Sequence, residues 1–324
     1  MQATAWGEQR EIDVLVIGDL NIDLILSGIP KLPAYGEEVL ATGITQRLGG
    51  SAANFAVCCA RLGLSVALVA NVGDDDFGAF LLGELERWGI ATDHVGTHPE
   101  LITGITVSLS GGRDRAFVTC VGTIDSLRGE DVPRELLPRC RHMHIASYFL
   151  QTRLQPDCPS LTRAAHAAGL GVSLDTGYDP AQRWNGDLLE LISEVDIFLP
   201  NEVEAQAIAG TTDPEAALAV LSAVVPVAVV KLGPHGAIAS AGPRTVHVPS
   251  FAVRVADTTC CGDAFNAGFI DALLAGRPLP DAVARGNGCG ALMASVMGND
   301  ARVLSPEAVR RLVNGPAAGG EMRS

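Results

Sequence analysis

Apolar and polar residues alternate along this chain in the order expected of strands followed by helices. An apolar run at Ile12–Ile17 ends at a Gly-Asp pair, the pattern of a buried strand that enters a turn. Small apolar residues at helical spacing follow at Ser51–Leu62, and a strand-like run lies at Val66–Val69. The spacing then predicts an amphipathic helix over Phe77–Trp88.

The same alternation continues in the second half of the chain. Strands are expected at His142–Ala146, Val172–Leu174, Ile197–Leu199 and Val227–Lys231, with helices near Leu161–Ala168 and Leu188–Ser193. Repeated strand–helix units predict an α/β fold with a mostly parallel central sheet, right-handed crossovers and helices on both faces. Ligands are then expected at the carboxyl ends of the strands.

Two regions depart from this alternation. Glu37–Gln46 has the pattern of a strand, and Ile102–Leu109 and Ala116–Val121 flank a turn of sequence Gly-Gly-Arg-Asp. We therefore expect a small antiparallel β sheet built from residues about 31–48 and 101–121. Such a sheet would serve as an active-site lid, as a dimer contact, or as both. The rest of the prediction is one domain over residues 11–315 with flexible tails at 1–10 and 316–324.

Composition supports this fold class and excludes several functions. Hydrophobic residues make up 48% of the 324 residues and aromatic residues only 5%, as in parallel sheets built on aliphatic side chains. The net charge is −14 and the only lysines are Lys31 and Lys231, so no basic stripe is available for nucleic acid. No apolar run reaches the roughly 18 residues of a membrane span.

The amino terminus and the cysteines indicate a cytoplasmic protein. The first residues lack the basic segment, apolar stretch and cleavage site of a secretory signal. The eight cysteines include the adjacent pairs Cys58-Cys59 and Cys260-Cys261 but no Cys-x-x-Cys spacing. Reduced thiols are therefore expected rather than disulfides.

The segment Asp257–Asn266 contains the strongest chemical signal. Small residues form a turn ahead of an apolar helix expected at Ala264–Leu274, so free backbone N–H groups and the helix dipole point at one place, which suits an anion. Asp263 lies in the first turn, where the helix terminus stabilises its ionised form. A carboxylate beside an anion site fits phosphoryl transfer, with Asp263 orienting a hydroxyl group for attack. A capped helix with an ordinary first-turn acid fits the local spacing equally well.

Five segments together resemble a known family. Besides Asp257–Asn266, the chain carries Gly18-Asp-Leu-Asn-Ile-Asp23, Leu48-Gly-Gly-Ser-Ala-Ala-Asn54 with Gly73-Asp-Asp-Asp-Phe-Gly78, Asn201-Glu-Val-Glu204 and Lys231-Leu-Gly-Pro-His-Gly236. In order and spacing these resemble the motifs of the PfkB, or ribokinase-like, carbohydrate kinases. The resemblance implies a three-layer ribokinase-like fold with a β lid, and ATP-dependent phosphorylation of a sugar hydroxyl with ATP and Mg²⁺.

The resemblance also implies roles for the residues around the turn. Asp263 would be the catalytic base, and the backbone of Cys260, Cys261 and Gly262 would form the anion hole. The family usually has glycine where this chain has Cys260, a residue that would be strained in a left-handed conformation. By resemblance, Asp257 and Thr259 match positions that bind a monovalent cation such as K⁺.

Substrate residues are expected near the first strand and the glycine-rich segment. Asn21 and Asp23 stand at alternate positions, so both can face one polyol, although a polar turn would have the same pattern. Gly49 and Gly50 allow a ligand close to the backbone. Asn54 offers an amide donor and acceptor, or caps a helix.

Ser51 bears on substrate charge. By resemblance, relatives that act on phosphorylated sugars have lysine in this glycine-rich segment, whereas Ser51 carries no charge. We therefore expect an unphosphorylated sugar or sugar-like substrate, or alternatively a nucleoside. Arg47 and Arg115 weaken this argument, because either could reach in from the lid.

The nucleotide side is expected around the later motifs. Asn201 and Glu204 share a helical face and suit Mg²⁺ held through water, although a capping pair has the same spacing. Lys231, Gly233 and Gly236 follow a strand where a nucleotide could approach. The resemblance adds two expectations, that Asn287 lies near the adenine and that the lid forms a homodimer.

Three alternatives remain open or are set aside at this stage. A non-catalytic sugar sensor of the same fold is a second functional class. The Gly-rich run at 286–291 lies outside the strand–helix context that a dinucleotide site requires. His142 and His144 alternate on a strand without a nearby third ligand, so we expect buried, hydrogen-bonded histidines rather than a metal site.

Overall fold

The computed structural model describes residues 9–111, 114–184 and 188–315, and its main sheet joins nine strands within these ranges. In spatial order they are β13 (Arg244–Val248), β12 (Ala237–Ala241), β11 (Val227–Lys231), β10 (Ile197–Phe198), β9 (Gly171–Leu174), β8 (Cys140–Ile145), β1 (Ile12–Ile17), β4 (Val66–Gly73) and β5 (Val95–His98). The strands from β11 to β5 are parallel, and β12 and β13 add an antiparallel edge. The mostly parallel sheet expected from the sequence is confirmed.

Strand alternation sends side chains into two separate cores, one on each face. On β1, Val14 and Val16 enter one core while Leu15 and Ile17 enter the other, and all four are fully buried. The first core is covered by α1 (Ser51–Arg61), α2 (Asp76–Arg87), α7 (Cys261–Leu274), α8 (Leu279–Ala294) and α9 (Pro306–Asn314). The second is covered by α3 (Cys158–Ala167), α4 (Leu188–Glu194), α5 (Glu202–Ala209) and α6 (Pro214–Ser222). The protein therefore has three layers.

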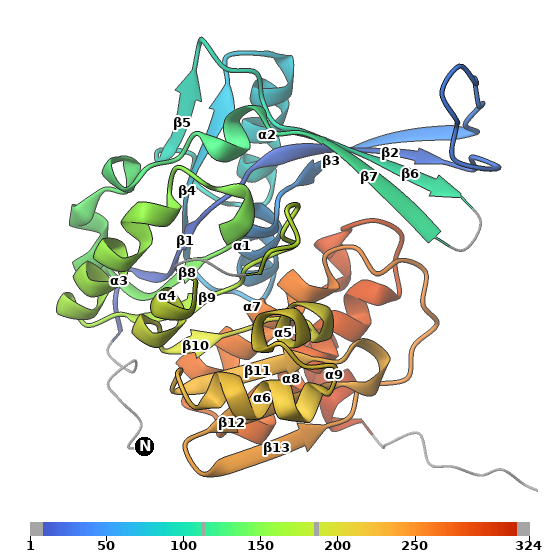
Figure 1. Cartoon of the computed structure of the whole chain (residues 1–324). Helices are drawn as coiled ribbons and strands as arrows, with labels where there is room; N and C mark the ends of the chain where they lie inside the picture. The colour runs from blue at the N-terminus through green and yellow to red at the C-terminus, as the bar shows by residue number, and fades with distance from the viewer. Residues whose placement is uncertain (1–8, 112–113, 185–187, 316–324) are drawn as a thin grey trace, which may run out of the picture.

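A second sheet projects from the body above its carboxyl-terminal half (Figure 1). Its strands lie in the order β3 (Gly43–Gly49), β2 (Asn21–Ser27), β6 (Ile105–Gly111) and β7 (Asp114–Cys120). The outer pairs β2–β3 and β6–β7 are antiparallel, whereas β2 and β6 run parallel in the middle. Sequence patterning identified the lid but not β2, which continues from the first motif, and β3 begins later than the strand expected at 37–46.

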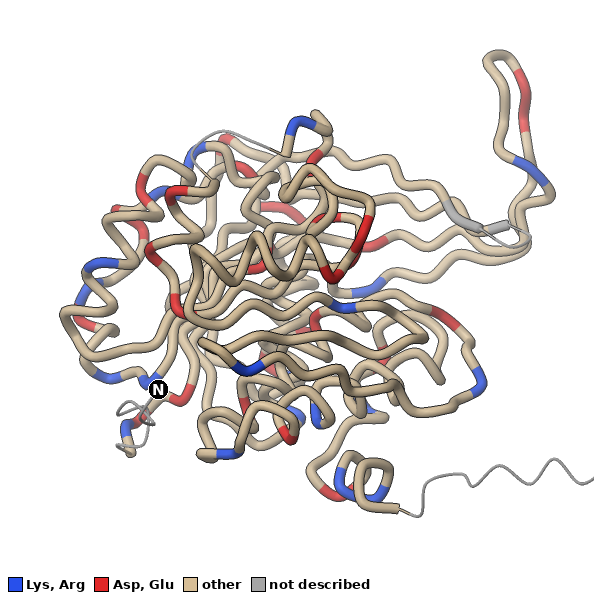
Figure 2. Tube along the Cα trace, turned by 60° about the horizontal axis from the view of Figure 1, so that its bottom comes forward, with Lys and Arg blue, Asp and Glu red and all other residues tan. Residues whose placement is uncertain are grey.

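Some expectations fall outside the described residues. Residues 1–8 and 316–324 of the two expected tails are among them, as are residues 112–113 of the expected lid turn. No helix in the described ranges is long and apolar enough to cross a bilayer. Figure 2 shows lysine and arginine scattered over the molecule rather than gathered into a stripe, as expected from their small number.

The histidines on β8 are buried and hydrogen-bonded, as expected. The Nε2 atom of His142 and the Nδ1 atom of His144 each lie 2.7 Å from the Oγ atom of Ser173 on β9. Both rings are fully buried. Burial lowers the pKa of His142 to about 3 and that of His144 to about 4. Both rings are therefore neutral in the folded protein at pH 7 and have a structural role.

This burial makes stability depend on pH. A histidine whose folded pKa is depressed contributes stability above its unfolded pKa of about 6.5, and that stability is lost as pH falls toward the folded value. As pH falls from 7 to 5, each such histidine lowers the free energy of unfolding by about 2 kcal/mol, because the unfolded chain binds the proton more readily. Urea unfolding should therefore show a smaller loss over this interval in His142→Gln than in the parent. All other titrating groups are common to both proteins, so equal losses would contradict the assignment.

Candidate active site

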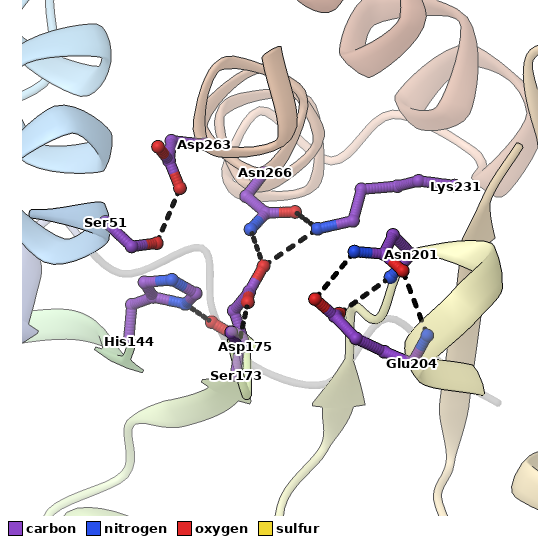
Figure 3. A network of polar contacts seen from close by, with 10 residues as sticks. Ser51, His144, Ser173, Asp175, Asn201, Glu204, Lys231, Asp263 and Asn266 are labelled. Atoms are coloured by element: carbon purple, nitrogen blue, oxygen red, sulfur yellow. Dashed lines mark hydrogen bonds and ion pairs between the residues drawn. The ribbon is translucent and has the colours of Figure 1, made fainter. Parts of the chain in front are cut away.

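Asp263 lies in the first turn of α7 and faces the amino terminus of α1. The Ser51 hydroxyl donates a hydrogen bond of 2.5 Å to its Oδ1 atom (Figure 3). Ser51 is itself fixed by Asp19, which follows β1 and accepts hydrogen bonds from the N–H groups of Ser51 and Ala52 at 3.2 and 2.9 Å. The aspartate is thus held at the carboxyl end of the sheet, where a ligand was expected.

The environment of Asp263 raises the pKa of its carboxyl group. Burial is the largest cause that raises its pKa, the Ser51 hydrogen bond acts in the opposite direction, and the charge of Asp175 acts with burial, so that the pKa lies at about 7. The sequence suggested that the helix terminus would keep this group ionised, but burial outweighs that effect. A carboxyl group with a pKa near neutrality can both accept and release a proton at physiological pH.

The turn before Asp263 leads into the amino terminus of α7. Cys260 is the N-cap of α7 and adopts the left-handed conformation, with φ 62° and ψ 6°. The N–H groups of the first helical turn lack partners within the helix, and the helix dipole adds positive potential there. A Cβ atom on Gly262 would lie 3.5 Å from the Nζ atom of Lys231. Backbone amides and an ammonium group therefore border one space, at the cost of about 1 to 2 kcal/mol of strain at Cys260.

A buried polar network anchors Lys231. Its Nζ atom lies 2.8 Å from Oδ2 of Asp175, which follows β9, and donates to Oδ1 of Asn266 on α7 at 3.2 Å. Asn266 in turn donates to Asp175 at 2.6 Å (Figure 3). Burial tends to lower the pKa of Lys231, but Asp175 and Glu204 outweigh it and raise the pKa. Burial likewise tends to raise the pKa of Asp175, yet Lys231 and Asn266 hold it below its usual value.

Asn201 and Glu204 form a capping box at the start of α5. The Asn201 N–H donates to Glu204 Oε2 at 2.9 Å, the Asn201 amide donates to Oε1 at 2.6 Å, and the Glu204 N–H donates to Asn201 Oδ1 at 2.9 Å. Burial, followed by the charge of Asp175, raises the pKa of Glu204 to about 8. The capping alternative is thus realised, and it places the carboxylate beside Asp175 and Lys231 in the same network.

The donor set fits a Mg²⁺ ion that is held mainly by a nucleotide. Within the described ranges, no three His, Cys, Asp or Glu side chains are grouped as a closed metal site would require. Asp175, Glu204 and Asp263 nevertheless share a buried region with one ammonium group, Lys231. This excess of carboxylate suits a hydrated cation that also binds substrate phosphates.

The expected substrate residues lie together at the base of the lid. Asn21 is 3% exposed, and its amide donates to Asp23 Oδ1 at 3.1 Å and to Thr106 Oγ1 on β6 at 3.5 Å. The Asp23 carboxylate lies over Gly49, where any side chain would collide with it. Gly50 has φ 95°, and a Cβ atom there would lie 2.5 Å from the Asp19 carbonyl oxygen. Gly50 is therefore required by its backbone conformation and close packing, whereas a side chain at position 49 would displace the Asp23 carboxylate.

Asn54 has a partner that the sequence did not reveal. Its Oδ1 atom accepts a hydrogen bond of 2.8 Å from Asn299, whose amide also donates to the Leu48 carbonyl group. The two asparagines line a cavity of about 340 Å³ that also includes Arg47. The Nε atom of Arg47 is buried without a hydrogen-bond partner. The side chain of Arg115, the other lid arginine considered, lies outside the described part of the chain.

The remaining sequence-predicted residues form hydrogen bonds to neighbouring loops or lie in turns. The carboxylate of Asp257 accepts hydrogen bonds from the Thr259 N–H and hydroxyl at 2.9 and 2.8 Å and from the Gly298 N–H at 3.0 Å. Asn287 donates to the Val248 carbonyl group at 2.9 Å. Gly233 and Gly236 both have positive φ, in the turn between β11 and β12.

Four residues of the site were not singled out from the sequence: Asp19, Asp175, Asn266 and Asn299. Asp175 directly follows β9 and Asp19 lies two residues after the end of β1, so their position was the available signal. Asn266 stands three residues after Asp263 on the same helical face. Asn299 had no local signal, because its role depends on the approach of a distant loop.

Comparison with known proteins extends the likeness over nearly the whole chain. The family model described as "pfkB family carbohydrate kinase" matches residues 11–305. The ribokinase of Haemophilus influenzae is 30% identical over 292 residues, covering 87% of this chain and 92% of that protein. The ribokinase of Bacillus subtilis is 30% identical over 310 residues, covering 93% and 99%.

Solved structures agree on the fold. An Escherichia coli protein described as a ribokinase II, solved with ATP and Mg²⁺, superimposes with a TM-score of 0.81. The sequence identity is 23%, and the match covers 94% of this chain and 99% of that one. The family model and the two ribokinase relatives identify the same family, with which the fold agrees. The chain belongs to the pfkB family of carbohydrate kinases.

Proposed function

We propose that this protein transfers the γ-phosphoryl group of ATP to a hydroxyl group of an unphosphorylated sugar or sugar-like molecule. One observation carries the proposal: a carboxyl group with a pKa near neutrality, Asp263, stands at the amino terminus of α7 beside the backbone amides of its first turn. The ribokinase names of the relatives support a sugar as the acceptor.

Each group of residues in the site has a separate role in the proposed phosphoryl transfer. Asp263 accepts the proton of the substrate hydroxyl as that oxygen bonds to the γ-phosphorus and the bond to the bridging oxygen of ADP breaks. The amides of residues 260–262 stabilise the charge that develops on the transferred group. Asn21 and Asp23 hold other hydroxyls, which fixes the reacting oxygen for in-line attack.

A Mg²⁺ ion would neutralise charge on the ATP phosphates. Glu204 and Asn201 would hold its water shell, and Asp175 adds a third polar group nearby. Asp257 and Thr259 are proposed to support a monovalent cation beside the anion hole. The Asp257 carboxylate already accepts hydrogen bonds from the Thr259 hydroxyl and the Gly298 N–H, which supports a role in ordering this turn.

The proposal extends to lid closure, dimer formation and a cytoplasmic location. Closure of the lid over the sugar would exclude water and so limit ATP hydrolysis. The lid exposes Ile44, Phe117 and Val118, which supports a homodimer formed through this sheet. The cysteines of the described chain are all free, in keeping with a cytoplasmic protein.

Replacing Asp263 tests the role of the base. Asp263→Asn keeps the shape of the side chain but removes its basicity, so turnover should fall about a hundredfold or more while sugar and ATP binding persist. Turnover is followed by ADP release and binding by calorimetry. Asp281→Asn, which alters an exposed first-turn acid of α8, is the matched control and should behave as the parent. Near-normal turnover in Asp263→Asn would require a different base.

The Ser51 hydrogen bond predicts a shift in the pH profile. Because Ser51 lowers the pKa of Asp263, its removal should raise that pKa above the present value of about 7. In the parent, kcat/KM should fall as pH drops below about 7, because the base becomes protonated. In Ser51→Ala, this acid limb should move to higher pH, with activity recovering in alkaline buffer. An unchanged limb would show that Ser51 does not act on the catalytic group.

A substrate panel tests the class of acceptor. Because Ser51 carries no charge, ADP release should be faster with ribose, fructose or other free sugars than with their phosphates. The ribokinase relatives favour free sugars over nucleosides, which are included in the panel as the alternative class. Arg47, with its unpartnered Nε atom, is the group that would favour a phosphorylated substrate. Preference for a sugar phosphate, lost in Arg47→Gln, would therefore overturn the unphosphorylated class. Ligand-induced stabilisation without turnover on any member would instead indicate a sensor.

A further inference from the structure

Two cysteines from distant parts of the chain meet beside the anion hole. The Sγ atom of Cys58, in the middle of α1, lies 4.0 Å from the Sγ atom of Cys260, the N-cap of α7. Cys58 is fully buried and Cys260 is half-buried. Both thiols are free, and 202 residues separate them in the sequence.

The same face of α1 makes both contacts with the start of α7. Cys58 follows Ser51 by seven residues, which is two helical turns, so the two side chains lie above one another. Ser51 contacts Asp263 and Cys58 contacts Cys260. A change in the spacing of the two sulfurs therefore acts on the element that carries the proposed base.

We propose that Cys58 and Cys260 are a site of oxidative modification, at which a peroxide joins them in a disulfide. Cys260, the more accessible thiol, attacks the peroxide oxygen, which breaks the O–O bond and gives a sulfenic acid and one water. The sulfur of Cys58 then attacks the sulfenic sulfur, forming the S–S bond and releasing a second water. Two thiols lose two electrons and two protons, and one hydrogen peroxide is reduced to two waters.

Neighbouring thiols do not offer an equivalent pairing. Cys261 directs its Sγ atom toward the Asp257 carbonyl oxygen, 3.9 Å away. Cys59 and Cys289 are fully buried, which shields both from a dissolved oxidant. Among the described cysteines, Cys58 and Cys260 therefore combine proximity with an accessible partner.

The disulfide would displace the anion hole. An S–S bond is about 2.05 Å long, so the two sulfurs must approach by about 2 Å. Cys260 already holds a strained left-handed conformation at the start of the turn, so its backbone is the part that yields. A displacement of about 1 Å at a reacting centre can cost about a hundredfold in rate. Oxidation should accordingly reduce turnover without unfolding the protein.

The experiment oxidises the full chain in a Cys120→Ser background, because Cys120 is exposed and would form disulfides between molecules. The protein is treated with hydrogen peroxide, its remaining thiols are alkylated, and peptides are mapped by mass spectrometry. We expect a cross-linked peptide pair containing Cys58 and Cys260, two fewer titratable thiols, and a turnover about a hundredfold lower that dithiothreitol restores.

Cys58→Ser in the same background is the matched control. It removes the sulfur that contacts Cys260 and leaves residues 260–262 unchanged, so turnover before oxidation should be close to that of its parent. Peroxide should then leave Cys260 as a sulfenic acid, which dimedone traps and which forms no cross-linked peptide. Absence of the 58–260 peptide from the oxidised parent, or a disulfide that joins Cys260 to another cysteine in its place, would overturn the proposal. The cross-link and thiol count test the site even if no kinase activity is found, whereas the loss of turnover rests on the proposed function.

Discussion

An imbalance of buried charge governs the candidate active site. Asp175, Glu204 and Asp263 approach one another at the carboxyl end of the sheet, and Lys231 is the ammonium group that they share. The fold holds these carboxyl groups with hydrogen bonds rather than with further cations. Ser51 donates a hydrogen bond to Asp263, and Asn201 donates one to Glu204. Burial raises the pKa of two of the carboxyl groups toward or above neutrality, so the site is poised to gain a cation or to take a proton.

The parallel sheet explains why residues so far apart in sequence converge. Asp19, Asp175 and Lys231 each stand at the carboxyl end of a strand, and parallel strands bring these ends to one edge. The helices supply the remaining groups, because α7 carries Asp263 and Asn266 on one face toward that edge. Catalytic geometry here is a consequence of strand direction and helix packing.

Sequence patterning predicted the layers well because β1 alternates between two cores, as Val14 and Leu15 show, and because helical spacing is regular. It missed β2 as a lid strand, since the chain leaves β1 and enters a different sheet within four residues. The motifs located Asp263 and Glu204, but not the Asn54–Asn299 contact, which depends on tertiary packing. The contact between Cys58 and Cys260 could not be predicted from the sequence either, because no local pattern links α1 to the turn before α7.

A crystal structure with a free sugar and a non-hydrolysable ATP analogue tests the central claim most directly. The account predicts the acceptor hydroxyl oxygen about 3 Å from a carboxylate oxygen of Asp263, in line with the γ-phosphorus, and the γ-phosphate oxygens against the amides of residues 260–262. A sugar bound with no hydroxyl within hydrogen-bonding reach of Asp263, or a γ-phosphate held away from the start of α7, would contradict it.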